Sequence, residues 1–249
     1  MDLRWGILAG YGPLFLQGMI MTVVLTVVSV SSGMVLGLGS GLVSSARGQP
    51  LPRSIWRWPL AAAQWVVAAY VTFFRGTPLF VQILLVHFAV MPALVHPDDG
   101  LLLSGEVARE FRQNHGAFLS GVLALTLNAG AYISEIFRAG IQSIGSGQWQ
   151  AAQVLGLSHL QTLRLVILPQ AFRRMVPAFV NEAITLTKDS SLVSAIGLAE
   201  LALAARTVAG AYSRYWEPYL AISAVYLLLT WLLSLLAKRL EVPAHLRGH

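Results

Sequence analysis

The sequence lacks two things that most soluble proteins have, namely cysteine and an ordinary share of charge. The absence of cysteine excludes disulfides, thiolate metal sites and cysteine nucleophiles. Charged residues make up 11% of the 249 residues, against about 25% in a typical soluble domain, and hydrophobic residues make up 56%. With a mean hydropathy of +0.66, the chain has too few charges to cover a globule in water. Composition therefore predicts an integral membrane protein.

Motifs of enzymes and nucleotide-binding proteins are also missing. The sequence has no Gly-x4-Gly-Lys-Ser/Thr loop, no Gly-x-Ser-x-Gly and no His-Glu-x-x-His. None of its six histidines stands at metal-ligand spacing with another ligand. We therefore expect no ATPase site, no metal, no cofactor and no catalytic residue in this chain. The net charge of +6 does not indicate nucleic acid binding, because the basic residues are dispersed at the ends of apolar runs.

Long apolar runs divide the chain into membrane-spanning segments. A helix needs about 20 residues to cross the hydrocarbon core, and five runs are long enough. A sixth, amphipathic run over 58–74 is expected to lie at the membrane interface. No extramembrane segment is long enough for a separate domain, so residues 1–249 are expected to form one transmembrane domain. The five expected spans are 13–46, 76–95, 117–140, 175–205 and 217–237.

The distribution of charge predicts which loops face the cytoplasm. The 47–57 loop carries three arginines and no acid, and more arginines follow the third span. The 96–116 loop instead holds four acids against two arginines, which suits the outer side. Basic residues return at the C-terminal end. Five crossings, with the N-terminus outside and the C-terminus in the cytoplasm, satisfy all of these loops.

Polar residues inside the fourth span share one side of a helix. At about 100° per residue, all five fall within an arc of about 120°. An ionised residue at the bilayer centre costs on the order of 2.5–3.5 kcal/mol, so the stripe needs a partner or a wet cavity. Its spacing is poor for ion pairs within one helix, which favours a translocation path over a structural ion pair. The residues are Asn181, Glu182, Thr185, Lys188 and Asp189.

A second polar line lies in the third span, where Asn128, Tyr132 and Glu135 follow i, i+4, i+7 spacing and share a helix face. Glu135 either pairs with Arg138, three residues on, or meets a base on another helix or the amine of a substrate. The segment 75–78, Arg-Gly-Thr-Pro, predicts a helix break at membrane depth that exposes backbone groups.

Glycines recur at intervals of four in the first span, at Gly33, Gly37 and Gly41. They place three residues without side chains on one helix face, which lets another helix backbone approach closely. Two interpretations stay open at this point. The face packs against a helix of the same chain, or it forms a seam with a second subunit.

The most specific signal is the segment 147–169, GQWQAAQVLGLSHLQTLRLVILP. It resembles the cytoplasmic coupling loop of the permease subunits of ABC importers, whose pattern begins Glu-Ala-Ala and ends Ile-x-Leu-Pro. Here Gln150 replaces the glutamate and Val166 the isoleucine. The resemblance implies that a short helix over about 146–158 docks on an ATPase. The residues implied in coupling are Gln150, Ala151, Ala152, Gly156 and Leu157.

Three further motifs resemble permeases for polar amino acids, of the histidine, glutamate, glutamine, arginine and opine type. They are FRGTP over 74–78, GAYISEIFRAGI over 130–141 and KDSSL over 188–192. Together with the coupling loop they extend the resemblance over roughly 14–235. It implies an all-α integral membrane protein with the type I ABC importer permease fold and about five transmembrane helices, in a bacterial inner membrane. The implied partners are two cytoplasmic ABC ATPases, a second permease that is the same or related, and an extracytoplasmic solute-binding protein.

An amino acid zwitterion needs an anion for its amine and hydrogen-bond donors for its carboxylate. We expect the acids of the two polar lines to meet the amine, and basic or hydroxyl groups to meet the carboxylate. Glutamate or glutamine is preferred, from the resemblance of the 87–97 region to acidic amino acid permeases. A gradient-driven secondary transporter, which often shows an inverted repeat not detected here, and an importer for another small polar solute are the alternatives. The expected substrate-binding residues are Asp189, Lys188, Glu135, Ser190, Ser191, Thr77, Asn181 and Thr185.

Overall fold

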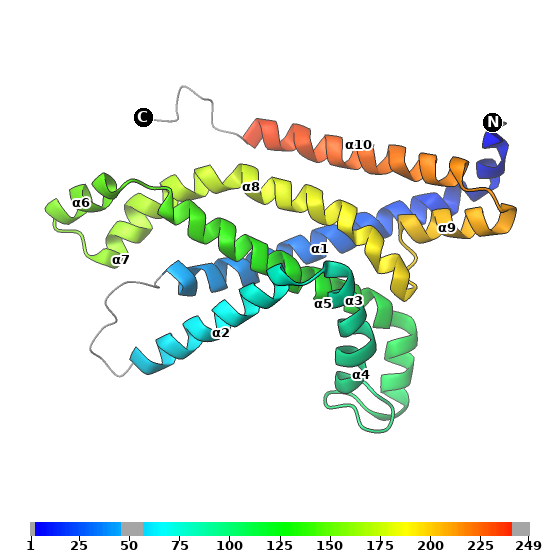
Figure 1. The fold of residues 1–249 in the computed structure, drawn as a ribbon, viewed down its shortest axis with the longest axis horizontal. Helices are drawn as coiled ribbons and strands as arrows, with labels where there is room; N and C mark the ends of the chain where they lie inside the picture. Colours follow the sequence, from blue (N-terminus) through cyan, green and yellow to red (C-terminus); the bar gives the residue numbers. More distant parts are fainter. Residues whose placement is uncertain (1–2, 46–56, 241–249) are drawn as a thin grey trace.

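The structure, a computed structural model, describes residues 3–45 and 57–240 and is almost wholly helical within them (Figure 1). Most of the arginine-rich loop at 47–57 and the C-terminal end beyond 240, both used above to predict orientation, lie outside the described residues. The α-helices are α1 (Gly12–Ser45), α2 (Arg57–Gly76), α3 (Leu79–Leu85), α4 (Met91–Leu94), α5 (Gly105–Gln142), α6 (Ser146–Val154), α7 (His159–Thr162), α8 (Leu168–Asp189), α9 (Leu201–Tyr212) and α10 (Trp216–Leu240).

Short segments of other helix types join several of these helices. A 3-10 helix precedes α1 over Trp5–Tyr11, and another follows α8 over Ser190–Ile196. Two π-helical segments, Val86–Val90 and Leu163–Ile167, lie between α3 and α4 and between α7 and α8. Such π segments often mark functional sites in helical proteins. The described residues contain no strand, which confirms the all-α prediction.

Over residues 3–45 and 57–240, three helices are long and apolar enough to cross a membrane by themselves, namely Trp5–Ser45, Gly105–Gln142 and Trp216–Arg239. Two further pairs pass the same test only together. Trp58–Gly76 and Leu79–Leu94 are bent by 112° at their junction, and His159–Ile196 and Leu201–Tyr212 by 51°. If each bent pair is one span, the described residues hold up to five candidate spans, which is the number that the sequence predicts.

The amphipathic run over 58–74 differs from the expectation of an interfacial helix. It belongs to α2, which packs against α1 and α5 and which, taken together with the helices after the break, has the length and composition of a span bent by 112°. The Tyr70 hydroxyl donates a 2.6 Å hydrogen bond to the Leu127 carbonyl of α5. Its amphipathic pattern therefore reflects one face against the bundle and one face outward.

The core of the protein is the contact between α1 and α5. A Cβ added at Gly33 would lie 2.9 Å from Ala129 Cβ, and one at Gly41 would lie 2.8 Å from Phe137 Cδ1. At Gly37 it would lie 2.5 Å from a methyl carbon of Ile133. The glycine face thus packs within the chain, against α5, rather than forming a seam with a second subunit. The buried cluster around this contact is Leu25, Ile83, Val86, Ala124, Leu125, Ala129, Ile133, Phe137, Ile141, Ile144, Ile167, Ala171, Met175, Phe179, Leu186, Val193, Ile196 and Leu198.

Gly37→Ala is expected to destabilise the protein by about 1–3 kcal/mol, because the added carbon must displace Ile133 and also lies 2.8 Å from the Gly130 carbonyl oxygen. Gly39 is the matched control, since a Cβ there meets nothing within 4 Å. Gly39→Ala should leave the midpoint of thermal unfolding unchanged or raise it, because alanine favours the helix. Thermal unfolding of the purified chain, followed by tryptophan fluorescence, measures both. Equal midpoints of thermal unfolding for the two variants would contradict the close packing of α1 against α5.

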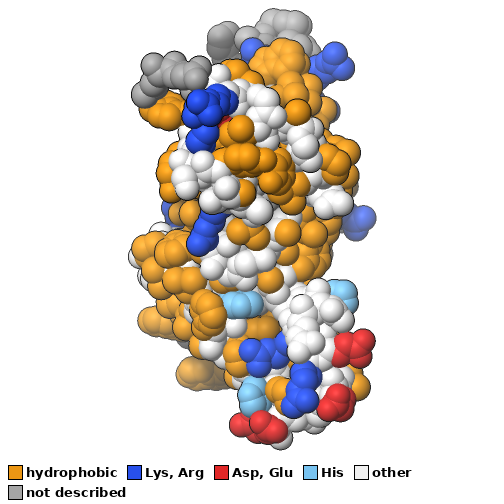
Figure 2. Space-filling model, turned by 90° about the vertical axis from the view of Figure 1, so that its right-hand side faces the viewer, with side chains coloured by type: hydrophobic (Ala, Val, Ile, Leu, Met, Phe, Trp, Pro, Cys, Tyr) orange, Lys and Arg blue, Asp and Glu red, His pale blue; other side chains and the backbone are white. Residues whose placement is uncertain are grey.

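A helical arm, defined as residues 79–116, projects from the rest of the molecule (Figure 1). It consists of α3, α4 and the first part of α5, with a loop at its tip. The loop is closed by a bridge between Val95 and Leu103, and His96 Nδ1 lies 2.8 Å from the Asp99 carboxylate. A small core of its own, Met91, Val95 and Ala108, joins its two sides. Figure 2 shows acidic, basic and histidine side chains gathered at this end of the molecule.

Candidate functional site

The break between α2 and α3 is held by a buried glutamine. α2 ends at Gly76, and Pro78, in extended conformation, precedes α3. Gln82 is 2% exposed, and its side-chain amide donates to the Phe74 carbonyl at 2.8 Å and to the Thr77 carbonyl at 3.0 Å. A chain that bends inside a membrane must satisfy the carbonyls that the break frees. The hydrogen bonds from Gln82 therefore stabilise the bend.

Asn128 connects this break to the central helix α5. Its side-chain amide donates to Gln82 Oε1 at 2.9 Å and lies 3.4 Å from the Phe74 carbonyl oxygen. The buried amides of Gln82 and Asn128 thus satisfy each other and the bent backbone. The sequence assigned no role to Gln82. A glutamine in an apolar run, just after a Gly-x-Pro break, is the signal that could have found it.

Gln82→Met is expected to destabilise the protein by about 1–3 kcal/mol, because two carbonyls and the Asn128 amide lose their buried partner. The double variant with Asn128→Leu should cost less than the sum of the single variants, since the two side chains form one network. Thermal unfolding of the four proteins measures this coupling. Strictly additive effects would show that the two amides act separately.

Thr77, an expected ligand of the substrate carboxylate, belongs to the same network. Its hydroxyl donates to the Phe73 carbonyl at 2.8 Å and accepts from Gln82 Nε2 at 2.9 Å. The hydroxyl proton is therefore used within the chain. This geometry makes Thr77 a positioning residue for the break and does not support it as a donor to a substrate.

Glu135 lies in an ion-pair cluster on α5, near the end of α2. Arg138 Nε donates to Glu135 Oε2 at 3.1 Å, and Arg75 Nη1 lies 3.7 Å from the same oxygen. The Arg75 guanidinium also stands 5.5 Å from the centre of the Tyr132 ring. Glu135 therefore interacts with both kinds of base expected from the sequence, namely Arg138 on the same helix and Arg75 on another helix. A substrate amine would have to displace one of them.

The polar stripe of the fourth span lies on the outer face of α8. Asn181, Thr185 and Lys188 are exposed, and Glu182 and Asp189 are half-buried, whereas Leu186 and Thr187 on the opposite face are buried. Among the described residues, Lys188 makes no ion pair, and no hydrogen bond or ion pair joins the stripe to Glu135. The structure confirms that these five polar residues share one side of the helix. The alternative of an internal ion pair is not found in this part of the chain.

The two serines that follow the stripe differ from each other. Ser190 is fully buried, and its hydroxyl donates to the Thr187 carbonyl at 2.7 Å. Ser190 therefore faces the inside of the chain in this arrangement, as its place about 180° from Asn181 on a helix also indicates. Its expected contact with the substrate carboxylate stays a prediction. Ser191 is half-buried, and its carbonyl accepts a hydrogen bond from Ser194. Within the described ranges, no three acidic or histidine side chains lie close enough to hold a metal ion.

The segment that resembles the coupling loop forms two short helices, α6 and α7, separated by a tight turn. The predicted helix over 146–158 ends in the structure at Val154. Gly156 has φ +76°, and the backbone N–H of Leu157 donates to the Ala152 carbonyl at 3.1 Å, which closes a Schellman-type helix end. Ser158 then caps α7 in a capping box with Gln161.

The exposure of α6 leaves one face available for a partner. Ala152 is buried, while Gln150, Ala151 and Gly156 are exposed and Leu157 is partly buried. Three apolar side chains near the turn, which the coupling pattern did not single out, are almost fully exposed, and apolar residues in so polar a segment are the signal that indicates them. They are Val154, Leu155 and Leu160, which are 87%, 78% and 72% exposed.

One hydrogen bond connects α8 to α6, and a second connects α8 to Ser143 at the end of α5, just before α6. Gln170 Nε2 of α8 donates to Gln148 Oε1 of α6 at 3.2 Å, and Arg174 Nη1 donates to the Ser143 carbonyl at 2.6 Å. The rings of Trp149 and His159 stack with centres 5.1 Å apart, which joins α6 to α7. The coupling segment is thus attached to α8, the helix that carries the polar stripe, by the bond between Gln170 and Gln148.

Long apolar helices with two bent pairs, a polar stripe on α8 and an exposed helical segment at one end fit the membrane-spanning component of a transporter. Residues 33–242 match the family of binding-protein-dependent transport system inner membrane components, and the chain belongs to this family. The family description implies a binding protein as a partner.

Relatives from several bacteria cover nearly the whole chain. The arginine transport system permease protein ArtQ of Bacillus subtilis is 34% identical over 92% of this chain and 91% of its own length. The L-cystine permease TcyB of the same organism is 36% identical, over 93% and 86%. The glutamine permease GlnP of Escherichia coli K12 is 32% identical, over 97% of each.

Solved structures show the same fold. A crystal structure of an amino acid ABC transporter with histidines contains a chain that is 35% identical, with a TM-score of 0.78 over 97% of this chain and 99% of that one. A chain of the MetNI methionine ABC transporter, in an inward-facing conformation, gives a TM-score of 0.68 at 23% identity, over 91% and 94% of the two chains. The permease family and the type I ABC importer fold inferred from the coupling loop are confirmed. An ABC system also implies an ATPase partner.

Proposed function

We propose that this chain is the permease subunit of an importer that moves a polar amino acid across the bacterial inner membrane, driven by ATP that a partner hydrolyses. The observation that carries the proposal is the similarity, over nine-tenths or more of the chain, to permeases whose substrates are amino acids. The chain has no phosphate-binding loop of its own, so the energy comes from two cytoplasmic ATPases. A gradient-driven carrier has no ATPase on which the coupling segment could dock.

The path for the substrate runs along the stripe on α8. Lys188 is exposed and Asp189 half-exposed on a membrane helix, and such charges do not face lipid without a large cost. We therefore place a second permease subunit opposite the stripe, with a wet cavity between the two. Asp189 meets the substrate amine, and Lys188 and Ser191 meet its carboxylate, while Asn181 and Thr185 line the path. Glu135 joins them if its arginine partners move.

The coupling segment supplies the movement. α6 docks on the ATPase through Gln150, Ala151 and the exposed Val154 and Leu155, and Ala152 and the turn at 156–157 hold its shape. Closure of the ATPase pair moves α6, and the contacts of α6 with α8 convert this into alternating access. Gln150 offers neutral hydrogen bonds, about half as strong as those of the family glutamate. Docking is therefore weaker here, or a non-identical partner permease carries the glutamate.

The arrangement in Figure 1 supports the proposed orientation. α6 and α7 lie at one end of the long axis, and the N-terminal end of α1 and α9 lie at the other. α10 runs from the α9 end toward the α6 end. With α6 on the cytoplasmic ATPase, the N-terminus is outside and the C-terminus is in the cytoplasm, and the whole chain acts as one transmembrane domain.

A competition experiment tests the substrate class. The chain is reconstituted in proteoliposomes with its ATPase and its binding protein, and uptake of labelled glutamine is challenged by acidic, amide, basic and apolar amino acids. We expect competition from one polar group, with glutamate or glutamine in first place. Uptake that no amino acid competes would overturn the proposed substrate class and favour another small polar solute.

A further inference from the structure

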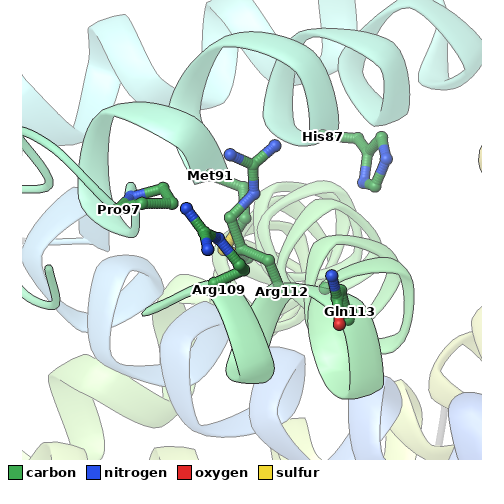
Figure 3. Close-up of a pocket in the computed structure, with 7 residues that line it drawn as sticks. His87, Met91, Pro97, Arg109, Arg112 and Gln113 are labelled. Atoms are coloured by element: carbon green, nitrogen blue, oxygen red, sulfur yellow. The ribbon is translucent and has the colours of Figure 1, made fainter. Parts of the chain in front are cut away.

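The helical arm contains a pocket that the proposed transport path does not use. Its volume is about 320 Å³, and it lies between the α3–α4 side of the arm and the first part of α5. Figure 3 shows the guanidinium groups of Arg109 and Arg112 extending from α5 toward the segment that carries His87 and Met91. The remaining lining residues are Pro97, Gln113 and Gly116.

The pocket has a positive charge without an internal counter-charge. No acidic side chain lines it. Arg109 Nη1 lies 3.4 Å from Glu106 Oε1, but both side chains are largely exposed, so this pair is weak. Arg112 is half-buried and makes no ion pair with any described residue, and the His87 ring is held by Ser120 at 3.0 Å. Two guanidinium groups that converge in this way suit an anion with several oxygens, such as a phosphate ester.

The α3–α4 side of the arm, which contributes His87 and Met91 to the pocket, also carries exposed apolar residues. Val81, Leu85 and Phe88 follow i, i+4, i+7 spacing along the arm and are 52%, 45% and 66% exposed. At the tip of the arm, Leu101 and Leu102 are 78% and 71% exposed. Figure 2 shows basic and histidine side chains next to hydrophobic ones at this end of the molecule. A ligand that fits both parts has an anionic head and long apolar chains.

We propose that this pocket binds the phosphate headgroup of an anionic phospholipid, whose acyl chains lie along Val81, Leu85 and Phe88. The two arginines contact the phosphate oxygens, and Gln113 is placed to contact the rest of the headgroup. A free phosphate would use the arginines but gain nothing from the apolar stripe. A carboxylate of the binding protein is the other possible anion, but it does not account for an exposed stripe that extends to Val81, far from the loop. Lipid binding would anchor the arm at the membrane boundary.

Native mass spectrometry of the full permease complex tests this proposal. The complex is titrated with phosphatidylglycerol and, separately, with phosphatidylcholine. We expect phosphatidylglycerol to bind more tightly, and the variant Arg109→Gln/Arg112→Gln to weaken its binding by roughly 25-fold, at about 5-fold for each arginine near a charged headgroup. Arg206→Gln, which removes an exposed arginine from α9, should leave binding unchanged.

Two further variants separate the site from a general effect on folding. Arg109→Lys/Arg112→Lys keeps the charge and should keep most of the lipid preference. Gly116→Leu keeps both arginines and adds a side chain to the pocket, where a Cβ would meet only Arg112 Cβ at 3.8 Å, an ordinary contact distance. We expect Gly116→Leu to lose the preference for phosphatidylglycerol.

Three results would overturn the proposal. The first is equal binding of the two lipids by the wild type. The second is displacement of the bound phosphatidylglycerol by inorganic phosphate at equal concentration, which would identify a site for free anions. The third is unchanged lipid binding in the double glutamine variant together with loss of ATPase stimulation by the binding protein, which would identify a protein contact.

Discussion

Replacing Gly156 by proline is expected to abolish transport while the membrane helices stay folded. Gly156 has φ +76° and donates its N–H to the Gln153 carbonyl at 2.9 Å. Proline fixes φ near −65° and has no N–H, so the turn that ends α6 cannot form. The exposed Val154 and Leu155, which we propose dock on the ATPase, then lose their position. Stimulated ATP hydrolysis and uptake should fall to less than about a tenth of the wild-type values, within the range of a typical coupling free energy.

The control for this variant is Gly147→Ala, also in α6, where a Cβ meets nothing within 4 Å. It should leave both activities unchanged. Thermal unfolding and co-purification of the ATPase show whether the spans remain folded and whether the complex still forms. Full stimulation of ATP hydrolysis in Gly156→Pro, with a normal unfolding midpoint, would show that this segment does not couple the two subunits.

Asp189→Asn is expected to weaken the apparent affinity for substrate during uptake by about tenfold or more. The amide keeps the size of the side chain but removes the charge that we assign to the substrate amine, and a hydrogen bond to a charged group contributes about 1.5–3 kcal/mol. The effect should fall on the KM for substrate delivered by the binding protein, measured in proteoliposomes at saturating ATP.

A matched control is Glu110→Gln, which makes the same chemical change at an exposed position of the arm, away from the stripe. It should leave the KM unchanged. An unchanged KM in Asp189→Asn as well would show that Asp189 does not contact the substrate. The assignment of the amine would then move to Glu135, whose release from Arg75 and Arg138 could be tested with Glu135→Gln.

The sequence predicted the features that repeat over many residues. The apolar runs, the stripe on α8 and the coupling segment each depend on local periodicity or on a motif, and the structure contains all three. The glycines at Gly33, Gly37 and Gly41 indicated close helix packing but not the identity of the neighbour. That identity depends on how α1 and α5, about 100 residues apart, meet in three dimensions.

Other features depended on contacts that no local pattern contains. The role of Gln82 requires the 112° bend, which brings its amide back to Phe74. The arm brings Arg109 and Arg112 opposite His87, although these residues are separated by a loop. Each of these is a tertiary effect that overrides the sequence pattern.

Measuring the energy source for uptake tests most directly whether this chain belongs to an ATP-driven importer. Proteoliposomes that contain this chain, its ATPase and its binding protein are loaded with ATP or left without it, and are tested with and without an imposed proton or sodium gradient. We expect uptake of a labelled polar amino acid that requires ATP and the binding protein and does not require a gradient. Uptake driven by a gradient in the absence of ATP would contradict it.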